Sequence, residues 1–466
     1  MATNVGDSSS YELLNLQSDI TNDTDSIAVL RVETTSQIST PNDILPHLTF
    51  PEGGLKAYSV VLGSFIGLVA NFGTVNSVGA IQTYVATHQL EDVKASTVSW
   101  IFSIYMALSF GMGVIVGPYF DAKGATAPLI AGCVLQTIGY MSSAVCTEVW
   151  QFILAFSICI GFGNALCITP LIGAISHWFF LKRGRAIAMA TIGGSIGGTF
   201  IPIMLRALYP KLGYPWAMRI LGFFCLGCMI IAIVLVKDRI PPTTNGDDKD
   251  SQGKKKQLLG LSKELFDFSI LKDMKFTFLV LGNFATELAL LSIMTYYPTY
   301  AITQNMSESS SYILLTIFNA SGVFGRLLPG YLSDIIGHFN VMILMLIGVI
   351  LSIFLLWIPF GYNHGVLFAF AASCGFFSSS ILSLTPVCLG VITPVNKFGQ
   401  RYGLMYFFVC TANLFGIPLA AAIIGDGSKY KYTMFAAFCG IFTVVGTFCW
   451  YLSRYCIVKF KINVKI

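Results

Sequence analysis

Long apolar stretches separated by short polar breaks run along most of the chain. A helix needs about 20 apolar residues to cross roughly 30 Å of hydrocarbon, and residues 57 to 456 supply twelve such stretches. Lipid offers no hydrogen-bond partners to backbone groups, and the stretches lack the alternation of a membrane barrel, so the pattern predicts an all-α membrane protein. The predicted spans are 57–87, 96–119, 125–146, 150–175, 184–206, 217–236, 276–303, 309–332, 338–358, 364–391, 402–425 and 432–456.

Three polar segments divide the chain. Residues 1–56 are rich in Ser, Thr, Asn and Asp, and we expect a disordered cytoplasmic arm there. Residues 237–275 separate six spans from six, and residues 457–466 form a short tail. The sequence therefore predicts two six-helix halves, 57–236 and 276–456, joined by a polar linker.

Composition supports a membrane protein. Of 466 residues, 55% are hydrophobic and 11% are charged, whereas soluble domains carry about 25% charged residues. A net charge of +5 would suggest nucleic acid as the partner of a soluble protein, but in a membrane chain the positions of the charges matter more than their sum. We therefore expect an integral, multi-pass membrane protein that contacts lipid and no nucleic acid.

The distribution of Lys and Arg predicts the orientation. With both termini placed inside, 6 of the 28 Lys and Arg residues fall on outer segments and 22 lie inside. Cytoplasmic segments carry such an excess of positive charge, so we expect both termini and the 237–275 linker in the cytoplasm. The six outer residues are Lys94, Arg206, Lys211, Arg219, Lys429 and Lys431.

Two loops repeat the pattern G-x-x-x-D-x-x-G at corresponding places in the two halves. Their aspartates, Asp121 and Asp334, are 213 residues apart. A second echo, Gly161-Phe162 with Thr169-Pro170 against Gly375-Phe376 with Thr385-Pro386, has offsets of 214 and 216. Agreement between these offsets indicates a half-on-half duplication, which is how many secondary transporters build two halves around one central site.

The repeated loops are candidates for a gate. An acidic side chain and turn-forming glycines there are suited to capping neighbouring helix ends and holding spans together in one of two alternating states. A plain loop turn is the alternative. The gating candidates are Gly117, Asp121, Gly124, Gly330, Asp334 and Gly337.

These loops and the twelve spans resemble the major facilitator superfamily over residues 51–460. Two further segments are similar to motifs of the monocarboxylate porter family, namely Pro51-Glu52-Gly53-Gly54 before the first span and Trp178 to Ala186 before the fifth. The residues of these motifs are most similar to those of the fungal monocarboxylate-transporter homologues, which include a yeast riboflavin permease. The resemblance implies two pseudo-symmetric halves and a secondary carrier of a small organic solute in the plasma membrane, which we expect to function as a monomer.

The sequence departs from the animal lactate carriers of that family at two positions. The resemblance places Asn76 where those carriers bind the carboxylate with a first-span lysine, and Gly322 where an aspartate pairs with the eighth-span arginine, here Arg326. An amide and a glycine supply no charge, so we favour riboflavin or a similar compound over a proton-coupled monocarboxylate. A non-transporting nutrient receptor on the same fold is the alternative from another class.

Glu287 is the most informative ionisable residue. It lies about eleven residues into the seventh span, or roughly 16 Å from Phe276, which places it near the membrane midplane. A carboxylate there is costly unless it faces a cavity or has a partner, so we interpret it as a group that handles substrate or a proton, with a structural hydrogen bond between helices as the alternative. Asn283 lies one turn earlier on the same face.

The other substrate or coupling candidates are polar or aromatic residues within apolar spans. Arg326 is placed either to pair with Glu287 or to act at the inner loop, and the sequence does not separate these roles. Rings in the seventh span are suited to stacking on a flat ligand or to packing, and buried amides to binding substrate or bridging helices. These candidates are Tyr296, Tyr297, Asn71, Asn76 and Asn164.

No motif in the sequence indicates an enzyme or a metal site. The chain contains no G-x-x-x-x-G-K-[ST] or H-E-x-x-H motif. One G-x-S-x-G match, Gly193 to Gly197, and one C-x-x-C pair, Cys225 and Cys228, lie within predicted apolar spans, where we interpret their small residues as packing contacts. We therefore expect no enzyme activity, no metal, no cofactor and no ATP hydrolysis. The expected function is alternating-access transport of a small molecule.

Overall fold

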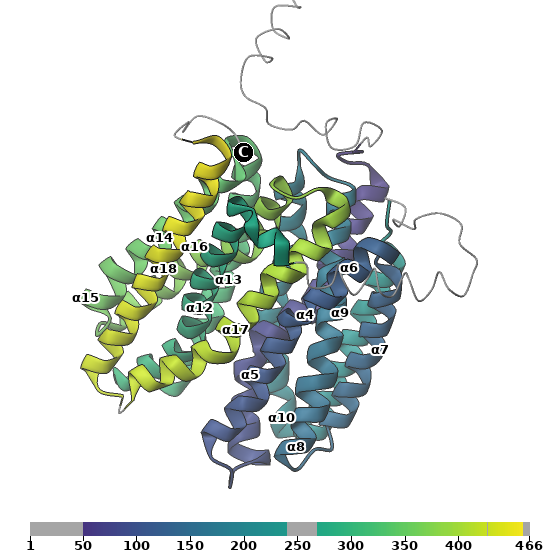
Figure 1. Cartoon of the computed structure of the whole chain (residues 1–466). Helices are drawn as coiled ribbons and strands as arrows, with labels where there is room; N and C mark the ends of the chain where they lie inside the picture. The colour runs from purple at the N-terminus through teal and green to yellow at the C-terminus, as the bar shows by residue number, and fades with distance from the viewer. Residues whose placement is uncertain (1–49, 240–267, 426, 460–466) are drawn as a thin grey trace, which may run out of the picture. The chain divides into compact units, whose positions relative to one another are not determined.

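The computed structural model describes residues 50–239, 268–425 and 427–459, which form helices and no strand (Figure 1). The expected arm at 1–49 and most of the expected linker lie outside the described residues. The first half contains α4 (Leu55–Tyr84), η1 (Val85–Gln89), α5 (Ala95–Gly111), α6 (Gly113–Lys123), α7 (Thr126–Ser143), α8 (Val149–Phe152), η2 (Ile153–Ile160), α9 (Gly161–Gly173), η3 (Ala174–His177) and α10 (Arg183–Leu235).

The second half follows the same plan. Asp273 caps its first long helix by accepting a hydrogen bond from the Lys275 amide. The elements are η4 (Phe268–Lys272), α12 (Met274–Thr303), α13 (Glu308–Ile336), α14 (His338–Leu351), η5 (Ser352–Trp357), α15 (Ile358–Phe360), α16 (His364–Val391), η6 (Val395–Lys397), α17 (Phe398–Ile424) and α18 (Lys429–Val458).

Ten helices in the described ranges are long and apolar enough to cross a membrane. Helix α10 contains both the fifth and the sixth predicted spans, which meet at Gly213, where φ is 71°. The third predicted span corresponds to α7, which is not among the ten because its composition is more polar. The all-helical membrane fold is confirmed, and the count of twelve spans stays a prediction.

Glycines allow α4 and α10 to touch along their backbones. A methyl group added to Gly193 would overlap the carbonyl oxygen of Phe65, and one added to Gly197 would overlap that of Val69. Small residues spaced four apart bring helices close enough for such contact, which supplies van der Waals attraction where the hydrophobic effect is absent. The glycines of the fifth span are therefore a packing face.

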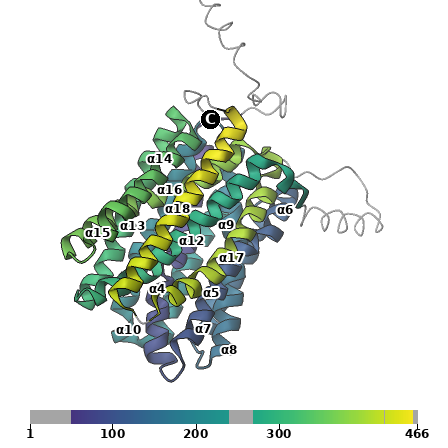
Figure 2. The ribbon, with the colours of Figure 1, turned by 60° about the vertical axis from the view of Figure 1, so that its left-hand side comes forward.

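The two halves meet mainly through two helices. Helix α17 packs against α5 and α6, and α10 packs against α13 and α16 (Figures 1 and 2). Where α17 meets α6, a methyl group on Gly117 would overlap the carbonyl oxygen of Gly399, and a methyl group on Gly403 would overlap that of Gly113. The backbones of the two halves are thus in direct contact there.

We expect Gly197→Leu to reduce the amount of folded protein severalfold. The leucine has no room against the α4 backbone, and overpacking of this kind costs about 1–3 kcal/mol or more. Gly227→Leu is the matched control, because it lies on the same helix with nothing within 4 Å of an added methyl group. Size-exclusion profiles of a fluorescent fusion after mild detergent extraction measure the effect, and equal monodisperse peaks for both variants would contradict it.

Candidate functional site

Asp334 joins the two halves at one end of the bundle. Its carboxylate accepts hydrogen bonds from the backbone amides of Gly184 at 3.0 Å and Arg185 at 3.1 Å. The Arg185 guanidinium adds a charge-assisted bond from Nε at 2.9 Å. Both amides belong to the first turn of α10, where unpaired N–H groups and the helix dipole favour negative charge. An acid from the second half therefore caps a helix of the first half.

Asp121 makes the reciprocal contact. Its two carboxylate oxygens accept hydrogen bonds from the amides of Gly399 at 2.9 Å and Gln400 at 2.8 Å, in the first turn of α17. The repeated loops thus cap helices across the interface in both directions. We call the end of the bundle that carries Asp121 and Asp334 the loop-aspartate end.

The remaining glycines of the repeated loops place these aspartates. Gly124 and Gly337 end α6 and α13 with φ of 84° and 100°, a backbone region that residues with a side chain rarely adopt. Gly330 packs against α10, because a methyl group on it would overlap the side chain of Ala188. Each glycine therefore supplies either a sharp helix end or a close approach between the halves.

Two motifs quoted separately from the sequence meet in space. The Glu52 carboxylate accepts hydrogen bonds from the amides of Phe180 at 2.7 Å, Leu181 at 2.7 Å and Lys182 at 2.9 Å, just before α10. Glu52 therefore fixes the segment that leads to the amides bound by Asp334. No local pattern in the sequence links these two motifs. The available signal was an acidic residue before the first span and a helix start in the same half, whose amides favour an acid.

A set of polar and aromatic groups lies deep in the bundle, and we call it the central polar cluster. Glu287 is 3% exposed, and its Oε1 has no hydrogen-bond partner among the described residues. One turn earlier, Asn283 accepts a hydrogen bond from the Thr385 hydroxyl at 3.0 Å. The cluster consists of Asn283, Glu287, Arg326, Tyr402 and Tyr406, of which the last three interact electrostatically with Glu287.

Arg326 connects the central polar cluster to the first half. Its Nη1 donates a hydrogen bond to the carbonyl oxygen of Thr191 in α10. No ion pair within 4.0 Å joins Arg326 to Glu287 in the part of the chain that the structure describes. The sequence left open whether Arg326 pairs with Glu287 or acts at the inner loop. Within the described residues its guanidinium makes no ion pair in either role and instead bridges α13 and α10.

Sequence reasoning missed Tyr402 and Tyr406. They lie four residues apart on α17 and so share one helix face, with ring centroids 4.7 Å apart. Tyr406 also stacks on Phe110 of α5, with a centroid distance of 5.3 Å and an interplanar angle of 20°. The sequence could have indicated this contact between the halves, because it places two tyrosines one helical turn apart in an apolar span.

Several predicted site residues lie outside the central polar cluster. The Asn71 amide bonds Gly67, Met229 and Gln136 within the first half. Asn164 donates to the hydroxyls of Tyr105 and Ser109, also in the first half.

The remaining three predicted residues bond carbonyl oxygens of neighbouring helices. Asn76 donates to Gly194 at 3.0 Å, next to Arg326. Tyr296 donates to Ile417 at 3.0 Å, and Tyr297 donates to Leu367 at 2.7 Å. These contacts account for both tyrosines as helix packing and leave Asn76 beside the cluster.

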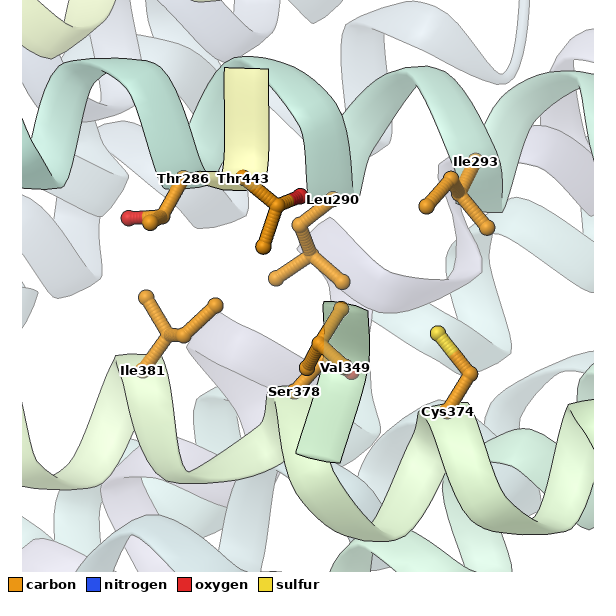
Figure 3. Close-up of a pocket in the computed structure, with 8 residues that line it drawn as sticks. All are labelled: Thr286, Leu290, Ile293, Val349, Cys374, Ser378, Ile381 and Thr443. Atoms are coloured by element: carbon orange, nitrogen blue, oxygen red, sulfur yellow. The ribbon is translucent and has the colours of Figure 1, made fainter. Parts of the chain in front are cut away.

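A small cavity lies within the second half, between α12, α14, α16 and α18. It has a volume of about 10 Å³ and is lined mainly by apolar side chains, among them Leu290, Ile293 and Ile381 (Figure 3). Such a volume holds about one water molecule at most. The cavity is therefore a gap in the packing of the second half and has no room for an organic solute.

Comparisons with known proteins match this architecture. The family model for the Major Facilitator Superfamily matches residues 61–366 and 307–456. The riboflavin transporter MCH5 of Saccharomyces cerevisiae is 40% identical over 421 residues, covering 89% of this chain and 81% of that protein. An MFS-type transporter of Gibberella moniliformis is 33% identical, covering 90% of this chain and 95% of that protein.

Solved structures agree on the fold. The transporter FucP, solved in its outward conformation, aligns with a TM-score of 0.64 over 86% of this chain and 98% of its own, at 14% identity. Together with the two capped helix pairs and the central polar cluster, these matches show that the chain belongs to the major facilitator superfamily and is a membrane transporter.

Proposed function

We propose that the chain carries riboflavin, or a similar flat and weakly charged compound, across the plasma membrane by alternating access. The observation that carries the proposal is the 40% identity to a riboflavin transporter over 89% of the chain. The central polar cluster supports it, because it combines hydrogen-bonding groups with the stacked rings of Tyr406 and Phe110. Asn76 supplies no charge for a carboxylate, which weighs against a monocarboxylate.

The caps at the loop-aspartate end suggest the state of the transporter. Asp121 and Asp334 hold the halves together there, so the central polar cluster is closed from that side. The excess of Lys and Arg on this side supports its assignment to the cytoplasm. In this proposal the structure is closed to the cytoplasm, and the six gating candidates act by making and breaking the caps.

Glu287 is proposed as the coupling residue, with Asn283 and Arg326 beside the substrate. A buried carboxylate without an ion pair is costly when charged, so it gains from taking up a proton or from contact with a substrate. Arg326 is close enough to sense its charge without neutralising it directly. Protonation of Glu287 would then be linked to the movement that separates α13 from α10.

Uptake of labelled riboflavin tests the function. Cells without their own carriers are expected to gain saturable riboflavin uptake when they express this chain, and to gain no uptake of lactate or pyruvate. An expressed, membrane-inserted chain that moves lactate or pyruvate but not riboflavin would favour the monocarboxylate alternative. Saturable uptake of no compound in a wide solute panel would favour a receptor.

Breaking one cap is expected to shift the population of states. Thr83 lies on an exposed part of α4 far from the loop-aspartate end. In a background without reactive native thiols, Thr83→Cys should react with an impermeant maleimide added outside intact cells. Adding Asp121→Asn weakens the cap on α17 and should lower this labelling severalfold, along with the transport rate, while equilibrium substrate affinity changes little. No labelling from outside would overturn the orientation, and unchanged labelling would overturn the gate.

Replacing Glu287 tests coupling. Glu287→Gln keeps the shape of the side chain but cannot titrate, so uptake should lose its pH dependence while exchange of bound substrate continues. Glu91→Gln, which changes an exposed acid in the turn after η1, is the matched control. If the Glu287→Gln variant keeps the pH dependence of uptake and the membrane abundance of the wild type, Glu287 is not the coupling residue. A fall in membrane abundance that Arg326→Gln partly rescues would instead assign it a structural role.

A further inference from the structure

Aromatic rings gather at the end of α4 that lies farthest from the loop-aspartate end. Tyr84 closes α4, and His88 lies in the π-helical segment η1 that follows. Tyr209 and Tyr214 come from α10, on either side of the break at Gly213. The rings of Tyr84 and Tyr209 are 3.8 Å apart at an angle of 13°, and those of Tyr84 and His88 are 4.1 Å apart at 7°.

These rings form a stack with one exposed end. Two rings that are both nearly parallel to Tyr84 and within about 4 Å of it would collide on the same face, so His88 and Tyr209 cover opposite faces. Tyr209 is buried, which closes that end of the stack. His88 is exposed. The outer face of the His88 imidazole is therefore available to a further flat ring.

Packing alone does not account for the polar groups of this stack. The hydroxyls of Tyr209 and Tyr214 are buried and have no hydrogen-bond partner within the described ranges. The Nδ1 atom of His88 bonds the Thr87 hydroxyl at 2.8 Å, which leaves Nε2 as the nitrogen that can meet a ligand. Single π-helical turns also concentrate at functional sites.

The stack stands at one end of a small and polar helix face. Asn76, Gly79, Thr83 and Thr87 are spaced three and four residues apart, so they share one side of α4. The last three are exposed, and an added methyl group on Gly79 would meet nothing within 4 Å. At its other end this face reaches Gly194, beside Arg326. The face thus leads from the aromatic stack to the central polar cluster.

We infer that the His88 ring is an entry site at which a planar fused heteroaromatic solute stacks before it reaches the central polar cluster. The inference rests on the proposed transport of a flat compound and adds a second, peripheral binding site. Stacking on an aromatic side chain tolerates varied polar substituents, because the contact uses the flat face of the ligand. Nε2 of His88 adds one polar contact at the ring edge.

The test compares three histidine variants in riboflavin uptake. His88→Ala removes the stacking face and should raise KM about fivefold or more, the effect of losing one stacked ring, while kcat stays within about twofold. His88→Phe keeps the ring and should restore most of the affinity. His364→Ala is the matched control, since His364 is also exposed but bonds only the Gln304 carbonyl oxygen, at 2.9 Å.

Failure of the entry site and failure of the transport function give different results. If the wild type transports riboflavin and His88→Ala keeps its KM, or only lowers the amount of protein in the membrane, the entry site is wrong and the transport function stands. If the wild type transports no riboflavin, the entry site is tested separately. Fluorescence anisotropy then measures whether the purified chain binds lumichrome, a planar fused heteroaromatic compound. Binding that falls in His88→Ala and returns in His88→Phe supports the site, and equal or absent binding overturns it.

Discussion

The structure depends on carboxylates of one half satisfying the first amides of a helix in the other half. Asp334 binds the start of α10, and Asp121 binds the start of α17. A helix start that is buried between two domains would otherwise leave N–H groups without partners, at a cost of about 1–3 kcal/mol each. Since both contacts lie between the halves, they stabilise the arrangement of the halves in this structure, and separating the halves at that end would break them.

The same helix pair carries both a cap and a contact of the central polar cluster. On α13, Asp334 and Arg326 both bind α10, the first at Gly184 and Arg185 and the second at Thr191. A rigid helix that moves away from α10 therefore breaks both sets of bonds together. If the caps act as the proposed gate, this geometry gives a physical route from Glu287 to that gate, because Arg326 interacts electrostatically with Glu287.

Polarity is unequally divided between the halves. The second half supplies every side chain of the central polar cluster, whereas the first half contributes the Thr191 carbonyl and the ring of Phe110. The amides of the first half are used for its own packing, as the Asn71 bonds to Gly67 and Gln136 show. Pseudo-symmetry therefore extends to the caps at the loop-aspartate end but not to the chemistry at the centre.

The sequence by itself determined the helical membrane fold and the repeat of the aspartate loops. The fold follows from each span taken alone, because the cost of exposing backbone to lipid does not depend on the neighbouring helices. The repeat follows from the matching offsets of two pairs of motifs. Tertiary structure decided which helix each loop aspartate caps, since Asp334 and Gly184 are 150 residues apart and Asp121 and Gly399 are 278 apart.

Tertiary structure also decided which polar residues share a site. It brought Tyr402 and Tyr406 to Glu287 and turned Asn71 and Tyr297 into packing contacts. The direction of a side chain depends on how each helix is rotated against its neighbours. In spans that are apolar on nearly all sides, hydrophobic periodicity does not fix that rotation, and close contacts such as that of Gly197 with α4 do.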